Sequence, residues 1–245
     1  MKNYADTDHK NKWADRDVEK HWDSVADIYI EENDKVKKAH EQRFTESVKY
    51  MELNDDSIVL NITSRDCEAN DFIKSINKKA KVTNAEISQG LINVAKKARP
   101  YVNQVKINTY SELPFEDNTF NRIICLETLE HVSDPIRFLK ELHRVSGSET
   151  KLVLSCPPLT SEIPYRIFTA LFGGHGEGPH RFLSTSEVKA MFEKTGWKLL
   201  FHKGTVLIPA GPAFLQNFGE TIIQQFQNSF ISELGIRQFY ACEKY

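Results

Sequence analysis

Between residues 57 and 156 the chain alternates short apolar runs with segments of helical spacing, and this alternation constrains its fold more than any other feature. Short apolar runs of this kind are typical of strands buried on both faces of a parallel sheet. Strands that alternate with helices favour a mostly parallel sheet with helices on both faces. The expected strands are 57–62, 81–87, 102–108, 121–127 and 151–156, followed by two final strands at 197–203 and 235–242.

Two of the expected helices have ends that the sequence itself defines. Asp134 is the expected N-cap of a helix with Pro135 at its first position. Ser184 and Glu187 form a capping-box pair at the start of a later helix, which is expected to end before Gly196.

The N-terminal part of the chain is expected to differ from the rest. Residues 1 to about 20 are polar and are expected to be loosely ordered, whereas apolar residues from Trp22 to Met51 follow a helical spacing. We expect a partly helical N-terminal extension over residues 1–30 and a single domain over residues 31–245.

Composition limits the possible function classes. The chain has 245 residues, a hydrophobic fraction of 40% and a net charge of −2, which favours a globular protein and argues against a dedicated nucleic-acid binder. No run approaches the roughly 18 apolar residues of a membrane span, and the N-terminus does not resemble a signal peptide. The four cysteines lack CxxC spacing, so neither a zinc site nor a disulfide framework is expected. We expect a cytoplasmic monomer or homodimer.

The carboxyl ends of the strands are where a sheet of this kind binds its ligand. Glu86 lies at the end of the second expected strand. A carboxylate in that place accepts hydrogen bonds from the two hydroxyls of a bound ribose. The alternative is an ordinary solvated carboxylate at a strand end.

One long segment resembles a known family. LPFEDNTFNRIICLETLEHVSDPIRFLKELHRV (113–145) resembles the central block of small-molecule class I S-adenosylmethionine-dependent methyltransferases, the group that includes quinone-biosynthesis enzymes. That block reads approximately Leu-Pro-Phe-x-Asp-x-x-Phe-Asp, a strand, Leu-Glu-His-Val and then Asp-Pro, and here Asn121 replaces the last Asp of the first motif. HRFLSTSEVKAMFEKTGWKLL (180–200) is similar to the family's segment before the sixth strand. The similarity covers roughly residues 40–205 and implies a Rossmann-like seven-stranded sheet whose last strand is antiparallel.

The resemblance also implies a site for S-adenosylmethionine across the ends of the first four strands. Thr109 and Tyr110 match the pair near the adenine, and Cys125 and Leu126 match the segment beside the methionine part. His131 matches a histidine close to the reacting centre and is the expected base for a hydroxyl or phenol acceptor; simple packing at the sheet edge is the alternative. The expected cofactor contacts are Asn61, Thr63, Arg65, Glu86, Ile87, Thr109, Tyr110, Cys125 and Leu126.

The first loop departs from the family's pattern. The family usually reads Asp-x-Gly-x-Gly-x-Gly, whereas residues 61–67 read NITSRDC, without a glycine. Glycine allows close backbone approach and positive φ, which costs any other residue roughly 1–2 kcal/mol. We therefore expect an altered loop. The absence of an acid at Asn61 and Thr109 is expected to weaken cofactor binding, and Arg65 is a candidate replacement partner for the cofactor's carboxylate.

The long connection after the fifth strand is the expected substrate region. Residues 157–183 contain the glycine-rich stretch 172–180 and are expected to form a lid-like insertion. The apolar segment 163–172 is expected to line an acceptor pocket, to pack in the core or to form a dimer contact. The spacing of His175, Glu177 and His180 is only a weak metal signal, and no metal is expected. The expected substrate contacts are Tyr165, Arg166, His175 and His180.

Three functions remain open. The first is S-adenosylmethionine-dependent methyl transfer to a small-molecule or lipid-like acceptor, which the Leu-Glu-His-Val segment and Glu86 favour. The second is a catalytically inactive relative that acts as a binding or scaffold partner, which the glycine-free loop favours. The third is a fold relative with a different nucleoside-like ligand. Methylation of nucleic acid ranks lower, because CPPL (156–159) lacks the Asn or Asp and the aromatic residue of the base-methylating motif.

Overall fold

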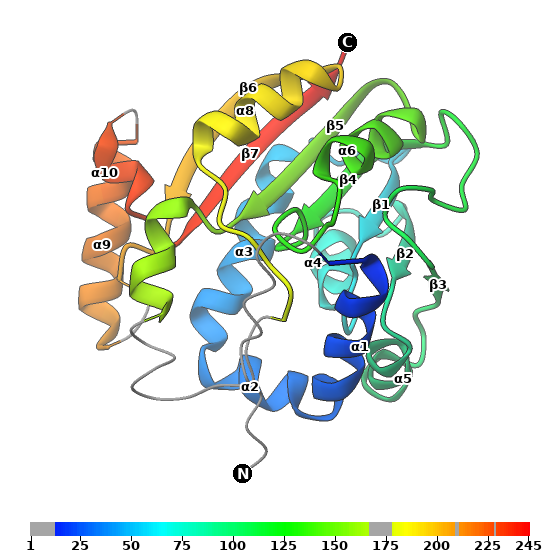
Figure 1. Ribbon diagram of the computed structural model, residues 1–245, viewed down its shortest axis with the longest axis horizontal. Coiled ribbons are helices and arrows are strands. Elements are labelled where there is room, and N and C mark those ends of the chain that lie inside the picture. The colour runs from blue at the N-terminus through cyan, green and yellow to red at the C-terminus, as the bar shows by residue number, and fades with distance from the viewer. Residues whose placement is uncertain (1–12, 167–177, 209–210, 228) are drawn as a thin grey trace.

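A computed structural model describes residues 13–166, 178–208, 211–227 and 229–245 of the chain. Its centre is a seven-stranded sheet with the strand order β3-β2-β1-β4-β5-β7-β6 (Figure 1). The strands are β1 (Ile58–Ile62), β2 (Lys81–Glu86), β3 (Gln104–Lys106), β4 (Phe120–Leu126), β5 (Ser146–Cys156), β6 (Trp197–Thr205) and β7 (Arg237–Lys244).

The helices lie before, between and after these strands. They are α1 (Asp15–Val25), α2 (Tyr29–Lys35), α3 (Lys37–Tyr50), α4 (Glu68–Ile76), α5 (Gln89–Ala98), α6 (Pro135–Arg144), α8 (Thr185–Lys194), α9 (Ala213–Gln225) and α10 (Phe230–Glu233), with short 3-10 turns η1 (Ala26–Ile28) and η2 (Leu159–Ser161).

Strand directions agree with the sequence expectation. Strands β1 to β5 pair in parallel, and β7 pairs antiparallel to both β5 and β6. The predicted Rossmann-like sheet with an antiparallel last strand is therefore confirmed. Strand β3 is shorter than expected, and β5 begins at Ser146, before the apolar run that predicted it.

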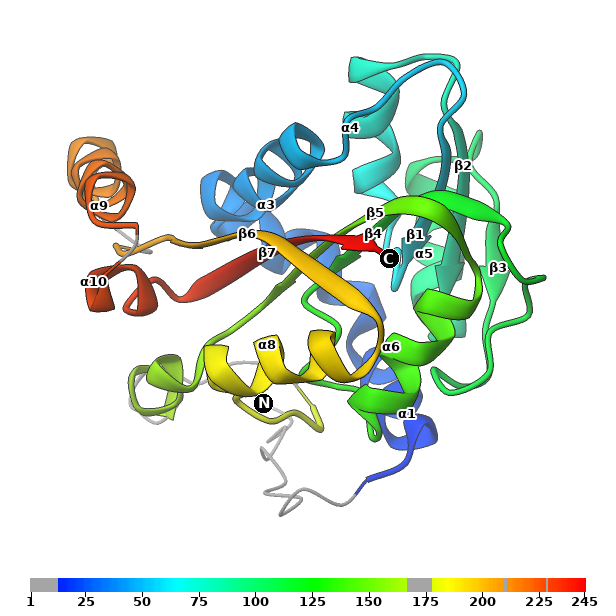
Figure 2. The same cartoon turned by 90° about the horizontal axis from the view of Figure 1, so that it is seen from above.

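Two separate cores cover the two faces of the sheet. Alternate side chains of a strand point to opposite faces, so Val59 and Ile124 pack with α3 and α4, whereas Leu60 and Ile123 pack in the larger core with α6 and α8. Figure 2 shows α3 and α4 on one side of the sheet and α6 and α8 on the other. Helices α9 and α10 lie beyond the β6 edge.

The predicted helix starts are confirmed by their side chains. The Asp134 carboxylate accepts a hydrogen bond from the backbone N–H of Arg137 at 3.0 Å, with Pro135 at the first turn of α6. At α8 the Ser184 hydroxyl and the Glu187 carboxylate form the expected reciprocal capping box.

The prediction of loose structure up to about residue 20 is wrong for the described residues. Helix α1 begins at Asp15, and its Val18, Trp22 and Val25 side chains are buried in the larger core. These apolar positions recur at helical spacing, but the surrounding charged residues hide the pattern in the sequence. The helix runs beside α5 at the end of the sheet where β1, β2 and β4 terminate (Figure 1).

None of the helices that the structure describes combines the length and the apolar character that a bilayer crossing requires.

Candidate cofactor site at the carboxyl edge of the sheet

The loop between β1 and α4 keeps a left-handed backbone without glycine. Thr63, Arg65 and Cys67 have φ values of 56°, 52° and 65°. These are the three positions where the family has glycine, so the expectation of an altered loop backbone is wrong at each of them. All three side chains are buried. Each residue stores roughly 1–2 kcal/mol of backbone strain, which the surrounding contacts must overcome.

Hydrogen bonds from three other segments hold this loop. The backbone N–H of Ser64 donates to the Ala85 carbonyl at 2.9 Å, and the Gln104 amide donates to the Arg65 carbonyl at 2.7 Å. The Arg99 guanidinium donates to both the carbonyl and the carboxylate of Asp66. A loop fixed from so many sides persists in a strained conformation, and strain of this kind is commonly found at functional sites.

Glu86 is the central acceptor of the loop. Its side chain is fully buried at the end of β2. One carboxylate oxygen accepts from the Arg65 N–H at 2.8 Å, and the other accepts from the Ile87 and Ser88 N–H groups at 2.8 and 2.9 Å. The carboxylate is at the predicted position, but in this conformation it binds the protein's own backbone and does not face open space.

Arg65 and Trp22 fill the space above the loop. The Arg65 guanidinium carbon lies 3.6 Å from the centre of the Trp22 ring, a close cation–π contact. The Arg65 side chain is 7% exposed, and its Nη1 has no hydrogen-bond partner among the described residues. The Trp22 ring also forms a T-shaped contact with the His131 ring at a centroid distance of 5.6 Å. Helix α1 therefore covers the loop directly.

Thr109 and Tyr110, the predicted adenine contacts, bind α1 as well. The Asp15 carboxylate accepts from the Tyr110 N–H at 2.8 Å and from the Thr109 hydroxyl at 2.6 Å. Its other oxygen accepts from the Ser133 hydroxyl at 2.9 Å. One carboxylate of α1 thus joins the loops that follow β3 and β4.

The remaining predicted cofactor residues lie at the same edge of the sheet. Asn61 is buried, and its amide donates to the Asn84 amide oxygen at 2.8 Å, so it points along the sheet toward β2. Cys125 and Leu126 end β4 and are buried. Burial raises the pKa of the Cys125 thiol, which is therefore protonated and unreactive at neutral pH.

His131 is buried beside the same helix. Its Nδ1 lies 2.9 Å from the Pro179 carbonyl oxygen. A carbonyl only accepts, so Nδ1 carries the proton and Nε2 keeps a lone pair. Burial, reinforced by the positive charge of Arg65, holds the pKa of His131 well below its ordinary value of 6.5. The neutral ring that results has the protonation state of a general base.

The predicted substrate residues divide into two groups. His180 packs edge-on against Tyr165 and Phe182, with centroid distances of 5.5 and 5.1 Å, and lies 6.3 Å from His131. Arg166 is exposed and forms an ion pair with Glu162. His175, Glu177 and most of the segment 163–172 lie outside the described residues. Among the predicted substrate residues that the structure describes, His180 therefore lies beside His131, Tyr165 packs against His180, and Arg166 lies on the surface.

A small cavity lies between the loop and α3. Its volume of about 10 Å³, lined by residues that include Arg43, Asn61, Thr63 and Arg65, has room for about one water molecule. Sites for small molecules usually measure hundreds of cubic ångströms. This cavity therefore cannot hold a cofactor. None of its lining residues comes from α1, from the end of β2 or from the loop after β3, the last two being the segments that the prediction assigns to the ribose and the nucleobase.

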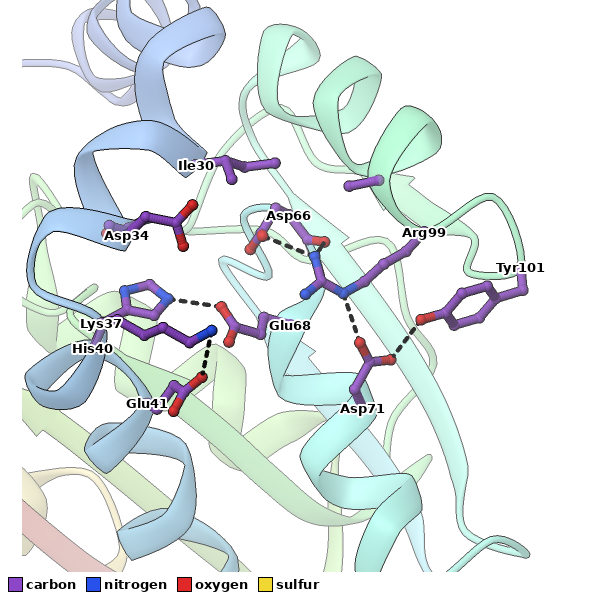
Figure 3. A pocket seen from close by; sticks show the side chains of 12 residues that line it. Ile30, Asp34, Lys37, His40, Glu41, Asp66, Glu68, Asp71, Arg99 and Tyr101 are labelled. Carbon is purple, nitrogen blue, oxygen red and sulfur yellow. Dashed lines mark hydrogen bonds and ion pairs between the residues drawn. The ribbon is translucent and has the colours of Figure 1, made fainter.

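A larger cavity of about 300 Å³ lies further out, between α2–α3 and the adjoining ends of α4 and α5 (Figure 3). None of the predicted cofactor residues lines it. Its charged walls pair with one another, through Arg99 with Asp66 and Asp71, His40 with Glu68, and Lys37 with Glu41.

Sequence reasoning missed Asp15 and Asp23 and recognised Trp22 only as a helical apolar residue. An acidic side chain in a charged N-terminal segment carries no local signal of a distant partner. One indication was available: from Asp15 onward, apolar residues recur at helical spacing among acidic ones, which is typical of a helix packed on one face.

Comparison with known proteins agrees with this fold. Residues 67–154 match the model of a family described as "Methyltransferase domain". Together with the strand order, this match confirms the resemblance to class I S-adenosylmethionine-dependent methyltransferases, whose fold the chain has.

The individual relatives are distant. A protein of Methanocaldococcus jannaschii named "Uncharacterized protein MJ0638" is 30% identical over 100 residues, which are 40% of this chain and 39% of that protein. The chain thus matches about two fifths of the length of this relative.

Solved structures share the fold over most of their length. An S-adenosylmethionine-dependent methyltransferase of Thermotoga maritima has a TM-score of 0.65 at 18% identity and covers 92% of this chain and 99% of its own. Geranyl diphosphate C-methyltransferase of Streptomyces coelicolor, solved with geranyl diphosphate and S-adenosyl-L-homocysteine, has a TM-score of 0.64 at 10% identity, with coverages of 85% and 82%.

Proposed function

We propose that the chain transfers a methyl group from S-adenosylmethionine to a small-molecule or lipid-like acceptor. The observation that carries this proposal is the loop at residues 63–67, which keeps three left-handed residues without a single glycine. A chain under no functional constraint would relax such strain, whereas a site that needs close backbone approach retains it.

The cofactor, when bound, supplies an already activated methyl group, so the protein mainly has to bind and orient the two reactants. Glu86 holds the loop through three backbone N–H groups. Because its ring is neutral, His131 is suited to receive the proton of a hydroxyl or phenol at Nε2. The Glu130 carboxylate, 3.9 Å from Nε2, is placed to stabilise the imidazolium that would result.

The proposed acceptor class rests on the aromatic rings that pack with His180, whose own ring lies 6.3 Å from that of His131. Tyr165, His180 and Phe182 form an aromatic cluster from residues after β5, which supports an acceptor with an apolar or aromatic body. A hydroxyl or phenol on that body would be directed toward His131.

Calorimetric titration with S-adenosylmethionine and S-adenosylhomocysteine tests the cofactor. Micromolar binding of either ligand supports the proposal. No binding at millimolar ligand, by the wild type and by Gly90→Ala, whose added Cβ would lie 2.8 Å from the Ala26 Cβ at the end of α1, contradicts it.

Transfer of a labelled methyl group to a panel of phenols, isoprenoid alcohols and amines tests the acceptor, with His131→Gln as the matched control. We expect label on a hydroxyl acceptor that the control no longer methylates. Equal transfer by both proteins would contradict the role of His131.

A further inference from the structure

We infer that helix α1 is an internal competitor of the cofactor: it occupies the cofactor's place in the described conformation and must leave before the cofactor binds. The inference rests on the proposed function. It is drawn from the contacts that α1 makes with the strained loop and with residues that the resemblance assigns to the cofactor.

The first contact of α1 uses the donors that the resemblance assigns to the nucleobase. Asp15 binds the Tyr110 N–H and the Thr109 hydroxyl, and its second oxygen binds the Ser133 hydroxyl. A backbone N–H beside a hydroxyl is a hydrogen-bonding pair that a planar nitrogen heterocycle also recognises. These groups cannot bind Asp15 and a base at the same time.

The second contact fills the volume above the strained loop. Trp22 is 4% exposed, and its ring packs against the Arg65 guanidinium and, in a T-shaped arrangement, against the His131 ring. The ring thus stands between the loop after β1 and the predicted catalytic residue. A sulfonium centre that delivers its methyl group near His131 would need this space.

The third contact fixes the far end of α1 to the start of α5. One oxygen of Asp23 accepts from the Ser88 hydroxyl at 2.6 Å and from the Gly90 N–H at 2.8 Å. Gly90 allows the helices to touch, because a Cβ at this position would lie 2.8 Å from the Ala26 Cβ and 3.2 Å from the Asp23 Cα.

The closed arrangement leaves polar groups unsatisfied, which makes it displaceable. Arg65 Nη1 and Trp22 Nε1 are buried and have no hydrogen-bond partner among the described residues. A buried polar group without a partner destabilises the state that buries it. The 3-10 turn η1 interrupts the helix between α1 and α2, so rotation at a few residues would release α1 and leave α2 in place.

The wedge variant Gly90→Ala tests the inference without removing a polar group. Its new Cβ collides with α1, whereas alanine is a better helix residue than glycine within α5. Gly147→Ala is the matched control, because its Cβ would meet nothing closer than 3.6 Å. Asp23→Ala is a second opening variant at an exposed side chain, should the wedge impair folding.

Two readouts are compared across these proteins, namely amide hydrogen exchange of residues 15–25 and calorimetric affinity for S-adenosylhomocysteine. Apparent affinity scales with the fraction of molecules in the open state. We expect Gly90→Ala and Asp23→Ala to speed exchange in α1 and to tighten ligand binding by about tenfold. Gly147→Ala should behave as the wild type, and adding ligand to the wild type should deprotect α1.

Two results would overturn the inference, and they separate it from the proposed function. If the wild type binds the ligand while α1 stays protected and the opening variants bind no more tightly, α1 is not a competitor and the cofactor assignment survives. If the opening variants expose α1 yet bind nothing at millimolar ligand, the cofactor assignment fails, and the competition fails with it.

Discussion

The Asp15 carboxylate accepts a hydrogen bond from the backbone N–H of Tyr110 at 2.8 Å, across 95 residues of sequence. Tyr110 follows β3 at the carboxyl edge of the parallel strands, and Asp15 begins the helix that covers this edge. The contact therefore links the N-terminal segment to the part of the site assigned to the nucleobase. Its strength decides how firmly α1 stays in place.

Replacement of Asp15 by alanine should loosen α1 without unfolding the domain. The variant loses hydrogen bonds from Thr109, Tyr110 and Ser133 to a carboxylate. The loss of a single hydrogen bond to a charged group costs about 1.5–3 kcal/mol, so exchange of the α1 amides should accelerate by at least about 10-fold. Mass spectrometry of exchange measures this. Asp27→Ala, at an exposed acid just beyond α1, is the control; equal acceleration in both variants would show that Asp15 does not anchor the helix.

Glu86 should stabilise the folded chain even when no ligand is bound. Glu86→Gln replaces one acceptor oxygen by an NH₂ group that opposes a backbone N–H. We expect the free energy of unfolding to fall by about 2 kcal/mol, as urea denaturation measures. The exposed Glu112→Gln should leave it unchanged. Wild-type stability in Glu86→Gln would mean that the carboxylate does not hold the loop.

Backbone strain at Cys67 predicts an unusual order of stabilities. Cys67→Gly and Cys67→Ala both delete the buried thiol, but only alanine retains the strain of a φ near 65°. The free energy of unfolding of the glycine variant should be about 1–2 kcal/mol higher than that of the alanine variant. At position 69, inside α4, the order should reverse. Ala69→Gly should have a free energy of unfolding about 1 kcal/mol lower than that of the wild type, which has alanine there. The same order at both positions would show that the loop relaxes.

The buried His131 predicts a loss of stability toward acid. Burial and the Arg65 charge lower the pKa of the folded-state imidazole well below 6.5. Below pH 6.5 the unfolded chain therefore binds a proton that the folded chain does not, and the free energy of unfolding falls as pH falls, by up to about 1.4 kcal/mol per pH unit.

His131→Gln should remove this contribution, so the stability curves of variant and wild type should run parallel above pH 7.5 and converge between pH 6.5 and 5. Denaturation at a series of pH values measures both curves. His40, His143 and His202 also have lowered pKa values, but they are present in both proteins and cancel in the comparison. An unchanged separation at pH 8 and pH 5 would contradict the assignment.

Local patterns account for the features that sequence analysis predicted. The apolar run at 57–62 became β1, and the Asp134-Pro135 pair began α6, because burial pattern and capping depend on neighbouring residues. The position of Glu86 at the edge of the sheet was predicted from its place at the end of the second expected strand. Its partners were not predicted, since they lie on a loop whose dihedrals depend on contacts from β2 and β3.

The sequence by itself determined the class of the fold, including the antiparallel last strand that the resemblance implied, and it predicted the edge of the sheet where a ligand would bind. Tertiary structure alone decided whether that place is open. Asp15 reaches Tyr110 and Trp22 reaches Arg65 only after the sheet has assembled, and no periodicity or motif encodes contacts between such distant residues. The same packing supplies the hydrogen bonds that keep Thr63, Arg65 and Cys67 left-handed where isolated residues of these types would relax.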